Sequence, residues 1–207
     1  LQAKYVGDAP THDFLASLCA QLSPGALPAG PSDQPGTWVI GPGVSRQQIE
    51  ASVPAMSQTP GTFVFLFQSP DALKALGTGL TVTPAKIVGD AIPQGPSPDN
   101  LLAGIGPSEL HLRGRTAIDG VLPAAGWHST AGAIAQMPLG KARLVFLQID
   151  PRAFDYTKPS RQYLKLTANH SRTLLCRVLA NAGILMDSPL LDLWSRPASQ
   201  AEIDLTT

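Results

Sequence analysis

Short apolar runs alternate with helix-forming patterns along the chain, and this alternation restricts its fold more than any other feature. Residues 62–67 (TFVFLF) form the clearest run, and residues 37–40 (TWVI) form a second. Neither run alternates apolar with polar side chains, which is typical of parallel strands buried on both faces. Each is followed by turn residues and an apolar helical pattern. This order predicts an α/β fold with three layers, in which helices cover both faces of a mostly parallel, doubly wound sheet.

The helix ends carry recognisable capping signals. Ser45 and Gln48 have the spacing of a capping box, and Ser69 stands before a proline that suits the first helical position. Gly183 is placed to end the last helix. Near the N-terminus, residues 3–7 (AKYVG) predict a strand, and Thr11 is a candidate N-cap for the helix that follows.

That first helix is expected to carry one apolar stripe of Phe14, Leu18 and Leu22 and a second of Leu15 and Cys19. Cys176 lies on the leucine-rich pattern of the last helix. Two cysteines cannot bind a metal by themselves, so buried free thiols and a disulfide between the two helices both stay open.

The C-terminal half predicts an antiparallel element at one side of the sheet. Residues 131–137 and 142–149 are apolar runs separated by a tight glycine-containing turn, which is typical of a hairpin. We expect residues 1–186 to form a single flavodoxin-like α/β domain. Residues 187–207 show too little pattern to fold alone and are interpreted as a tail or linker.

Charge and hydropathy restrict the partners. Lys and Arg number 15 and balance 15 Asp and Glu, so the formal net charge is zero. A neutral chain lacks the basic surface that binds nucleic acid or anionic membranes, and the basic residues are scattered apart from Arg161, Lys165, Arg172 and Arg177. No apolar run approaches the roughly 18 residues that cross a bilayer. We therefore expect neither nucleic acid nor a membrane as a partner.

No motif for catalysis, a cofactor or a metal is visible. Ser69 follows the strand at residues 62–67, where a nucleophile would stand, but no G-x-S-x-G surrounds it, and helix capping is favoured. Gly41-Pro42-Gly43 is interpreted as the turn that ends a strand, with phosphate binding as the weaker alternative. The four histidines are dispersed and lack metal-ligand spacing. We predict no catalytic residue, no cofactor and no metal site.

Trp127 and His128 follow a glycine and precede polar residues, so we expect them in an exposed loop. An exposed indole there can stack on a sugar ring or dock on a neighbouring domain, and docking is favoured.

Five segments occur in an order that resembles a known family: residues 39–44 (VIGPGV), 63–76 (FVFLFQSPDALKAL), 101–112 (LLAGIGPSELHL), 139–150 (LGKARLVFLQID) and 174–184 (LLCRVLANAGI). Together they resemble the glutamine-amidotransferase-like, flavodoxin-like domain near the C-terminus of some bacterial β-galactosidase-like enzymes of glycoside hydrolase family two. The resemblance covers most of residues 37–184. The hairpin turn, which reads Pro138-Leu139-Gly140-Lys141, lacks the first glycine of the family pattern.

The resemblance implies a domain without amidotransferase chemistry. Where those amidotransferases carry a nucleophilic cysteine, this chain has Gln68-Ser69. Hydrolysis in such enzymes belongs to a separate barrel, so the implied partners are that barrel and the other domains of the parent, with a homo-oligomer also possible. The parent family favours a periplasmic or secreted location, although the chain shows no signal peptide. Its first residue is Leu, which indicates either a removed leader or a piece of a longer protein.

Three functions follow from these observations. The first is a non-catalytic accessory domain that packs on a larger carbohydrate-active hydrolase or helps it to oligomerise. It predicts an exposed apolar patch that includes Trp127, Trp194 and Leu190-Leu191.

The second is a carbohydrate-binding module with its ligand at the carboxyl ends of the strands. The candidate ligand-binding residues are Asp8, Gln68, Ser69, Trp127 and His128. The third is a free-standing enzyme with a site that no motif reveals.

Overall fold

A seven-stranded sheet in the order β2-β1-β3-β4-β9-β8-β7 forms the centre of the structure. The computed structural model describes residues 2–92 and 101–187. The strands of this sheet are β1 (Ala3–Val6), β2 (Leu22–Pro24), β3 (Gly36–Ile40), β4 (Gly61–Leu66), β7 (Trp127–His128), β8 (Ile134–Leu139) and β9 (Ala142–Leu147). The five from β2 to β9 are parallel neighbours, and β8 and β7 continue the sheet in antiparallel pairs. The predicted mostly parallel α/β sheet is confirmed, and the order of its parallel part is that of flavodoxin-like folds.

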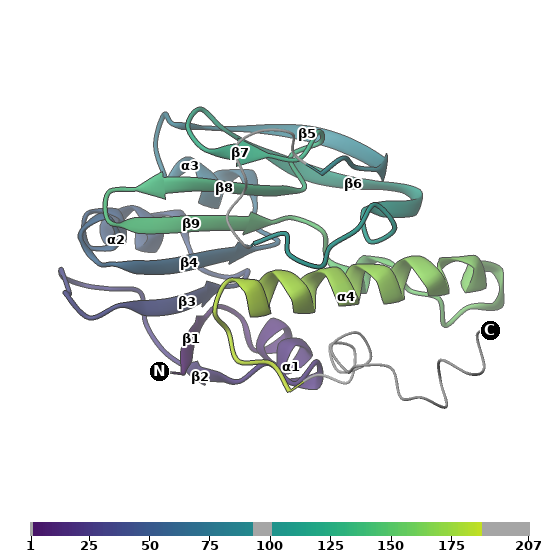
Figure 1. Ribbon diagram of the computed structural model, residues 1–207, viewed down its shortest axis with the longest axis horizontal. Helices are drawn as coiled ribbons and strands as arrows, with labels where there is room; N and C mark the ends of the chain where they lie inside the picture. The colour runs from purple at the N-terminus through teal and green to yellow at the C-terminus, as the bar shows by residue number, and fades with distance from the viewer. Residues whose placement is uncertain (1, 93–100, 188–207) are drawn as a thin grey trace.

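Helices cover both faces of the sheet (Figure 1). One face carries α1 (Ala9–Ser17) and α4 (Lys165–Asn181), and the other carries α2 (Arg46–Gln58) and α3 (Pro70–Lys74). Successive side chains of a strand point to opposite faces, so Val64 and Leu66 pack under α1 and α4 while Phe63 and Phe65 pack under α2 and α3. All four are fully buried. This explains why the strand has no polar alternation.

The predicted hairpin is present at one side of the sheet. Strands β8 and β9 pair from Leu139↔Ala142 to Ile134↔Leu147. Gly140 stands in the turn with φ of 57°, and a Cβ there would lie 2.2 Å from the carbonyl oxygen of Ser57. Both the left-handed backbone and this close approach require glycine at the position.

A two-stranded antiparallel ribbon, β5 (Leu80–Gly89) and β6 (His111–Pro123), forms a second sheet. Its register breaks where Ile87 pairs with Thr116 but Gly89 pairs with His111, so β6 carries a bulge at residues 112–115. Within this bulge Gly114 has φ of 92° and Arg115 has φ of 41°. Two short 3₁₀ helices, η1 (Pro151–Ala153) and η2 (Pro159–Leu164), lead from β9 to α4.

The predicted caps at Ser45, Ser69 and Gly183 are confirmed. Ser45 Oγ accepts a hydrogen bond from the Gln48 N–H at 3.3 Å, and Gln48 Oε1 accepts one from the Ser45 N–H at 2.8 Å. Ser69 Oγ accepts from the backbone N–H of Ala72 at 3.3 Å. After α4, Gly183 has φ of 93° and the next N–H closes a Schellman motif onto Leu179 O at 3.0 Å.

The first helix differs from the prediction at both ends. Asp8, not Thr11, is the N-cap, since Asp8 Oδ1 accepts from the Thr11 N–H at 2.9 Å and the proline after Ala9 fits the first turn. The helix stops at Ser17 because Cys19 adopts φ of 62° and closes its C-terminus. Cys19 is therefore not in mid-helix. Cys176 is buried in α4 as predicted, and no disulfide joins it to Cys19.

The division into a domain of residues 1–186 and a tail stays a prediction, and residues 188–207, with Trp194 and Leu190-Leu191, lie outside the described part of the chain. Within the described ranges, no helix has the length and apolar character needed to span a membrane.

Candidate functional site

The carboxyl edge of the parallel strands is where doubly wound sheets bind ligands, at the point where the strand order reverses. Here that point lies between β1 and β3. It brings together Gly7-Asp8, which follow β1, and Gly41-Pro42-Gly43, which follow β3. The backbone N–H of Asp8 donates to Pro42 O at 2.7 Å, so the two turns are joined directly.

The crevice between these turns is filled by the side chain of Tyr5. A Cβ built on Gly41 would lie 2.2 Å from the Tyr5 hydroxyl oxygen, and one built on Gly7 would lie 2.7 Å from it. The hydroxyl donates to the carbonyl oxygen of Asp8 at 3.0 Å. The two glycines are thus needed to admit the tyrosine, and its ring occupies the space between the two turns.

The electrostatics of Tyr5 suit a structural hydrogen-bond donor. Burial, together with the nearby carboxylate of Asp8, raises the pKa of Tyr5 to about 12. The hydroxyl therefore keeps its proton at neutral pH and cannot act as a base there. Its ring packs in a tilted arrangement against His12, with ring centroids 5.2 Å apart.

The turn after β4 is closed by two buried glutamines. Gln68 Nε2 donates to Ile40 O and to Leu66 O, both at 2.9 Å. Its amide nitrogen is thus hydrogen-bonded to the last residues of β3 and β4. Gln148 clamps the same turn, because its Oε1 accepts from the Gln68 N–H and its Nε2 donates to Gln68 O, each at 2.9 Å. Both side chains are less than a tenth exposed. Ser69 caps α3.

An arginine covers the outside of this edge. The guanidinium of Arg152 lies 5.2 Å from the ring centroid of Phe14 and 5.6 Å from that of Phe67. Arg152 also donates to both carboxylate oxygens of Asp150, at 2.8–3.1 Å, and these bonds raise the pKa of Arg152. Phe67 has φ of 54°, a strained conformation at a strand-to-helix turn, and α/β-hydrolases place their nucleophile at such a turn.

Trp127 and His128 lie elsewhere. They form β7, paired with Gln136 and Ala135 of β8, instead of the predicted exposed loop. In the sheet, β9 and β8 lie between β4 and β7, so the axes of β4 and β7 are about 14 Å apart at roughly 4.8 Å between neighbouring strands. The Trp127 ring is half-buried against the core because edge-strand pairing turns it inward, while His128 is exposed.

The structure therefore groups three of the five predicted ligand-binding residues, Asp8, Gln68 and Ser69, near the carboxyl edge, and leaves Trp127 and His128 apart from them. A ligand-binding role for any of the five stays a prediction. Sequence reasoning missed Tyr5, Gln148 and Arg152. Gln148 bonds to the distant Gln68 and Arg152 lies over the distant rings of Phe14 and Phe67. Tyr5 bonds to the nearby Asp8, but its close approach to Gly41 appears only in the folded sheet. Among the residues described, no three His, Cys, Asp or Glu side chains gather as a metal site.

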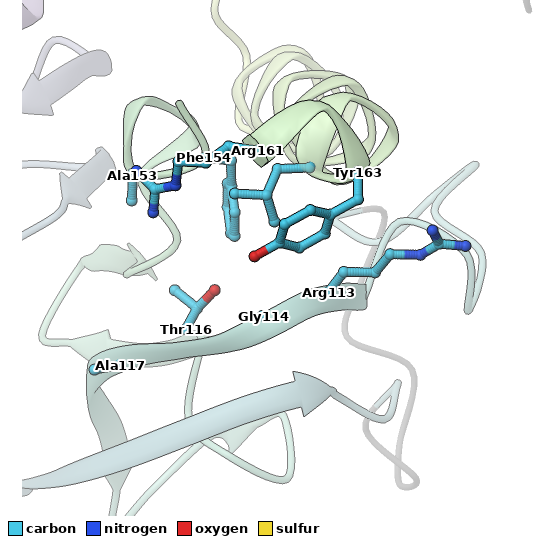
Figure 2. A pocket seen from close by; sticks show the side chains of 9 residues that line it. Arg113, Gly114, Thr116, Ala117, Ala153, Phe154, Arg161 and Tyr163 are labelled. Atoms are coloured by element: carbon cyan, nitrogen blue, oxygen red, sulfur yellow. The ribbon is translucent and has the colours of Figure 1, made fainter. Parts of the chain in front are cut away.

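A different hollow, the β6–η2 pocket, lies between β6 and the segment from η1 to η2 (Figure 2). Its volume is about 210 Å³. Its lining consists of Arg113, Gly114, Thr116, Ala117, Ala153, Phe154, Arg161, Tyr163 and Leu164. The hydroxyls of Thr116 and Tyr163 point toward each other across it, and the lining includes two arginines and no acidic residue.

Comparisons with known proteins give little further direction. No protein-family model matches the sequence, and no curated protein matches it. Among solved structures, the chain is similar to the exo-β-1,4-mannosidase Op5Man5 from Opitutaceae bacterium strain TAV5, with a TM-score of 0.47 and 14% identity. The match covers 89% of this chain and 36% of the mannosidase chain. A likeness this weak says nothing about activity.

Proposed function

We propose that this chain is a non-catalytic accessory domain of a larger carbohydrate-active hydrolase, where it packs against the other domains of the parent. The observation that carries the proposal is the filled carboxyl edge. Tyr5 occupies the crevice between β1 and β3, and the glutamine pair seals the turn after β4. A site without room for substrate supports a role other than catalysis at the place that this fold normally uses.

The exposed apolar side chains support packing on another domain. Tyr163 is 54% exposed and Leu166 is 52% exposed, and both line a shallow hollow of about 410 Å³ on the outer side of η2 and α4. The hollow also carries polar groups, from Arg113, Gln162, Lys165 and Asn169. An apolar centre with a polar rim is the composition of interfaces between domains. Of the apolar patch predicted from the sequence, Trp127 is half-buried in β7, and Trp194 and Leu190-Leu191 lie outside the described part of the chain.

The first test concerns the natural polypeptide. An antibody raised against the isolated chain is used to isolate the natural protein, whose mass and activity on a panel of nitrophenyl glycosides are measured beside those of the isolated chain. We expect a much larger polypeptide that hydrolyses a glycoside, and an inactive isolated chain. Glycoside hydrolysis by the isolated chain, or a natural polypeptide no larger than it, would overturn the proposal.

Hydrogen exchange then tests the packing surface. Peptides that contain Tyr163 and Leu166 should exchange more slowly in the natural polypeptide than in the isolated chain, since docking removes their backbone from water. Peptides around Val88, a residue 46% exposed on β5, serve as the control and should exchange equally in both. If the peptides with Tyr163 and Leu166 exchange at the same rate in the natural polypeptide and in the isolated chain, this surface is not the interface, and it no longer supports the proposal.

A further inference from the structure

We infer that the β6–η2 pocket binds the carboxylate of an acidic sugar. The pocket is distinct from the carboxyl edge, because it is built from the bulged part of β6 and the segment between β9 and α4. Its volume of about 210 Å³ corresponds to roughly seven water molecules at ~30 Å³ each, which suits one ring-sized ligand.

The charge of the pocket selects an anion. Arg161 belongs to η2, and no ion pair or side-chain hydrogen bond joins its guanidinium to another of the described residues. Asp155 is the acidic group that its charge influences, but this carboxylate is engaged by Thr157, whose N–H and hydroxyl donate to it at 2.9 and 2.7 Å. Those hydrogen bonds hold the pKa of Asp155 below its usual value, with a further contribution from Arg161. A planar guanidinium that makes no direct ion pair or hydrogen bond to the described residues, at the rim of a hollow, is suited to a carboxylate.

The rest of the lining suits a sugar ring. The hydroxyls of Thr116 and Tyr163 point into the space from opposite walls, where each can donate to and accept from ring hydroxyls (Figure 2). Phe154 and Leu164, both buried, supply the apolar wall beside them. A small number of convergent polar groups on an apolar wall is the usual composition of a small-molecule site.

The bulge in β6 brings the strand close to η2 on one side of the pocket. A Cβ on Gly114 would lie 3.3 Å from Leu164 Cδ2, so glycine lets η2 approach the strand closely. The left-handed residues Gly114 and Arg115 form the bulge that ends just before Thr116. Bulges next to binding sites commonly re-aim a side chain in this way.

The choice of a sugar rests on the proposed function, whereas the preference for a carboxylate rests on the charge of the pocket alone. The experiment therefore measures the affinity of the isolated chain, by NMR titration or calorimetry, for glucuronate, glucose, cyclohexanecarboxylate and inorganic phosphate. We expect glucuronate to bind at least about tenfold more tightly than each of the other three, and more weakly at high salt because exposed charges are screened. Absence of glucuronate binding, or equal binding of any of the other three, would overturn the inference.

Variants separate the pocket from a general charge effect. Arg161→Gln should weaken glucuronate binding at least about tenfold, since a hydrogen bond to a charged group contributes more than a neutral one. Tyr163→Phe should weaken it less and leave the carboxylate preference intact. Arg46→Gln is the matched control, because it removes one arginine charge from α2 on the other side of the sheet and should leave the affinity unchanged. Equal effects of Arg46→Gln and Arg161→Gln would refute the site. Binding is measured on the isolated chain, so its failure is distinct from a failure of the test on the natural polypeptide.

Discussion

The side chain of Gln148 links the turn after β4 to β6, and replacing it with methionine tests how much its hydrogen bonds contribute to the free energy of unfolding. The two side chains have similar length, so Gln148→Met removes hydrogen bonds while leaving little cavity. The wild-type amide makes three hydrogen bonds at 2.9 Å: with the Gln68 N–H, with Gln68 O and with Asp119 O. The variant leaves these three backbone groups without that partner.

The magnitude follows from the burial of those groups. An unsatisfied buried donor or acceptor costs about 1–3 kcal/mol, and the two groups on Gln68 are buried whereas Asp119 O is partly within reach of water. We therefore expect Gln148→Met to lower the free energy of unfolding by about 4 kcal/mol. For a chain of this length that corresponds to a fall in Tm of roughly 10 °C.

Urea unfolding followed by tryptophan fluorescence measures this change, with thermal unfolding as the second readout. Gln162→Met is the matched control, because Gln162 is exposed and its Nε2 makes one hydrogen bond, to Tyr156 O at 2.7 Å. It should lower the free energy of unfolding by less than about 1 kcal/mol. If Gln148→Met is no less stable than Gln162→Met, the buried amide does not hold the turn, and the explanation of the sealed edge is wrong.

Three further predictions concern backbone and packing. Cys19→Gly should raise the free energy of unfolding, measured with urea, by about 0.5–1 kcal/mol, because glycine relieves the left-handed φ of 62°. Gly183→Ala should lower it by about 1 kcal/mol, because alanine is strained at a φ of 93°. A less stable Cys19→Gly or a more stable Gly183→Ala would refute this account of the helix ends. Gly41→Ala should lower the free energy of unfolding by more than about 2 kcal/mol, and adding Tyr5→Phe should restore part of that loss in the same assay, since its Cβ would stand 2.2 Å from the Tyr5 hydroxyl oxygen; no recovery would mean that the hydroxyl is not the obstacle. The folded state holds the Tyr5 proton more tightly than the unfolded chain, with a pKa of about 12 against 10.0, so this stabilising contribution is present below pH 10 and is lost as the pH rises from 10 to 12; urea midpoints over that range should fall more steeply for the wild type than for Tyr5→Phe, and parallel curves would contradict it.

Local signals explain why much of the fold could be predicted from the sequence. The run at residues 63–66 is apolar throughout because the sheet buries both faces of β4 there, and the caps at Ser45 and Ser69 need only the residues of one helical turn. The helix α1 shows where local signals mislead. Cys19 is an ordinary apolar residue by pattern, and nothing in its neighbourhood indicates the left-handed backbone that ends the helix there.

The candidate site could not be predicted in the same way, because its contacts join distant segments. Gln68 and Gln148 are 80 positions apart, and Arg152 reaches Phe14 and Phe67 only after the sheet has formed. The sequence search looked for a nucleophile at Gln68-Ser69 and found none. It had no means to find a tyrosine that fills the crevice, since Tyr5 has the pattern of an ordinary strand residue.

The turn after β4 holds Phe67 in the left-handed region, and α/β-hydrolases use a similarly strained turn between a strand and a helix. A non-glycine residue in the left-handed region is strained by roughly 1–2 kcal/mol, and such strain persists only where the surroundings enforce it. Here the surroundings are visible: the Phe67 N–H donates to Leu147 O at 2.9 Å, the ring lies under Arg152, and the next residue is clamped by Gln148. Each of these contacts closes the edge as well as holding the turn. The strain at Phe67 is therefore maintained by contacts with β9, with Arg152 and with the turn that Gln148 holds. Under the proposed function the same contacts close the edge, and the β6–η2 pocket, which is built outside the parallel sheet, is the place to test for a ligand.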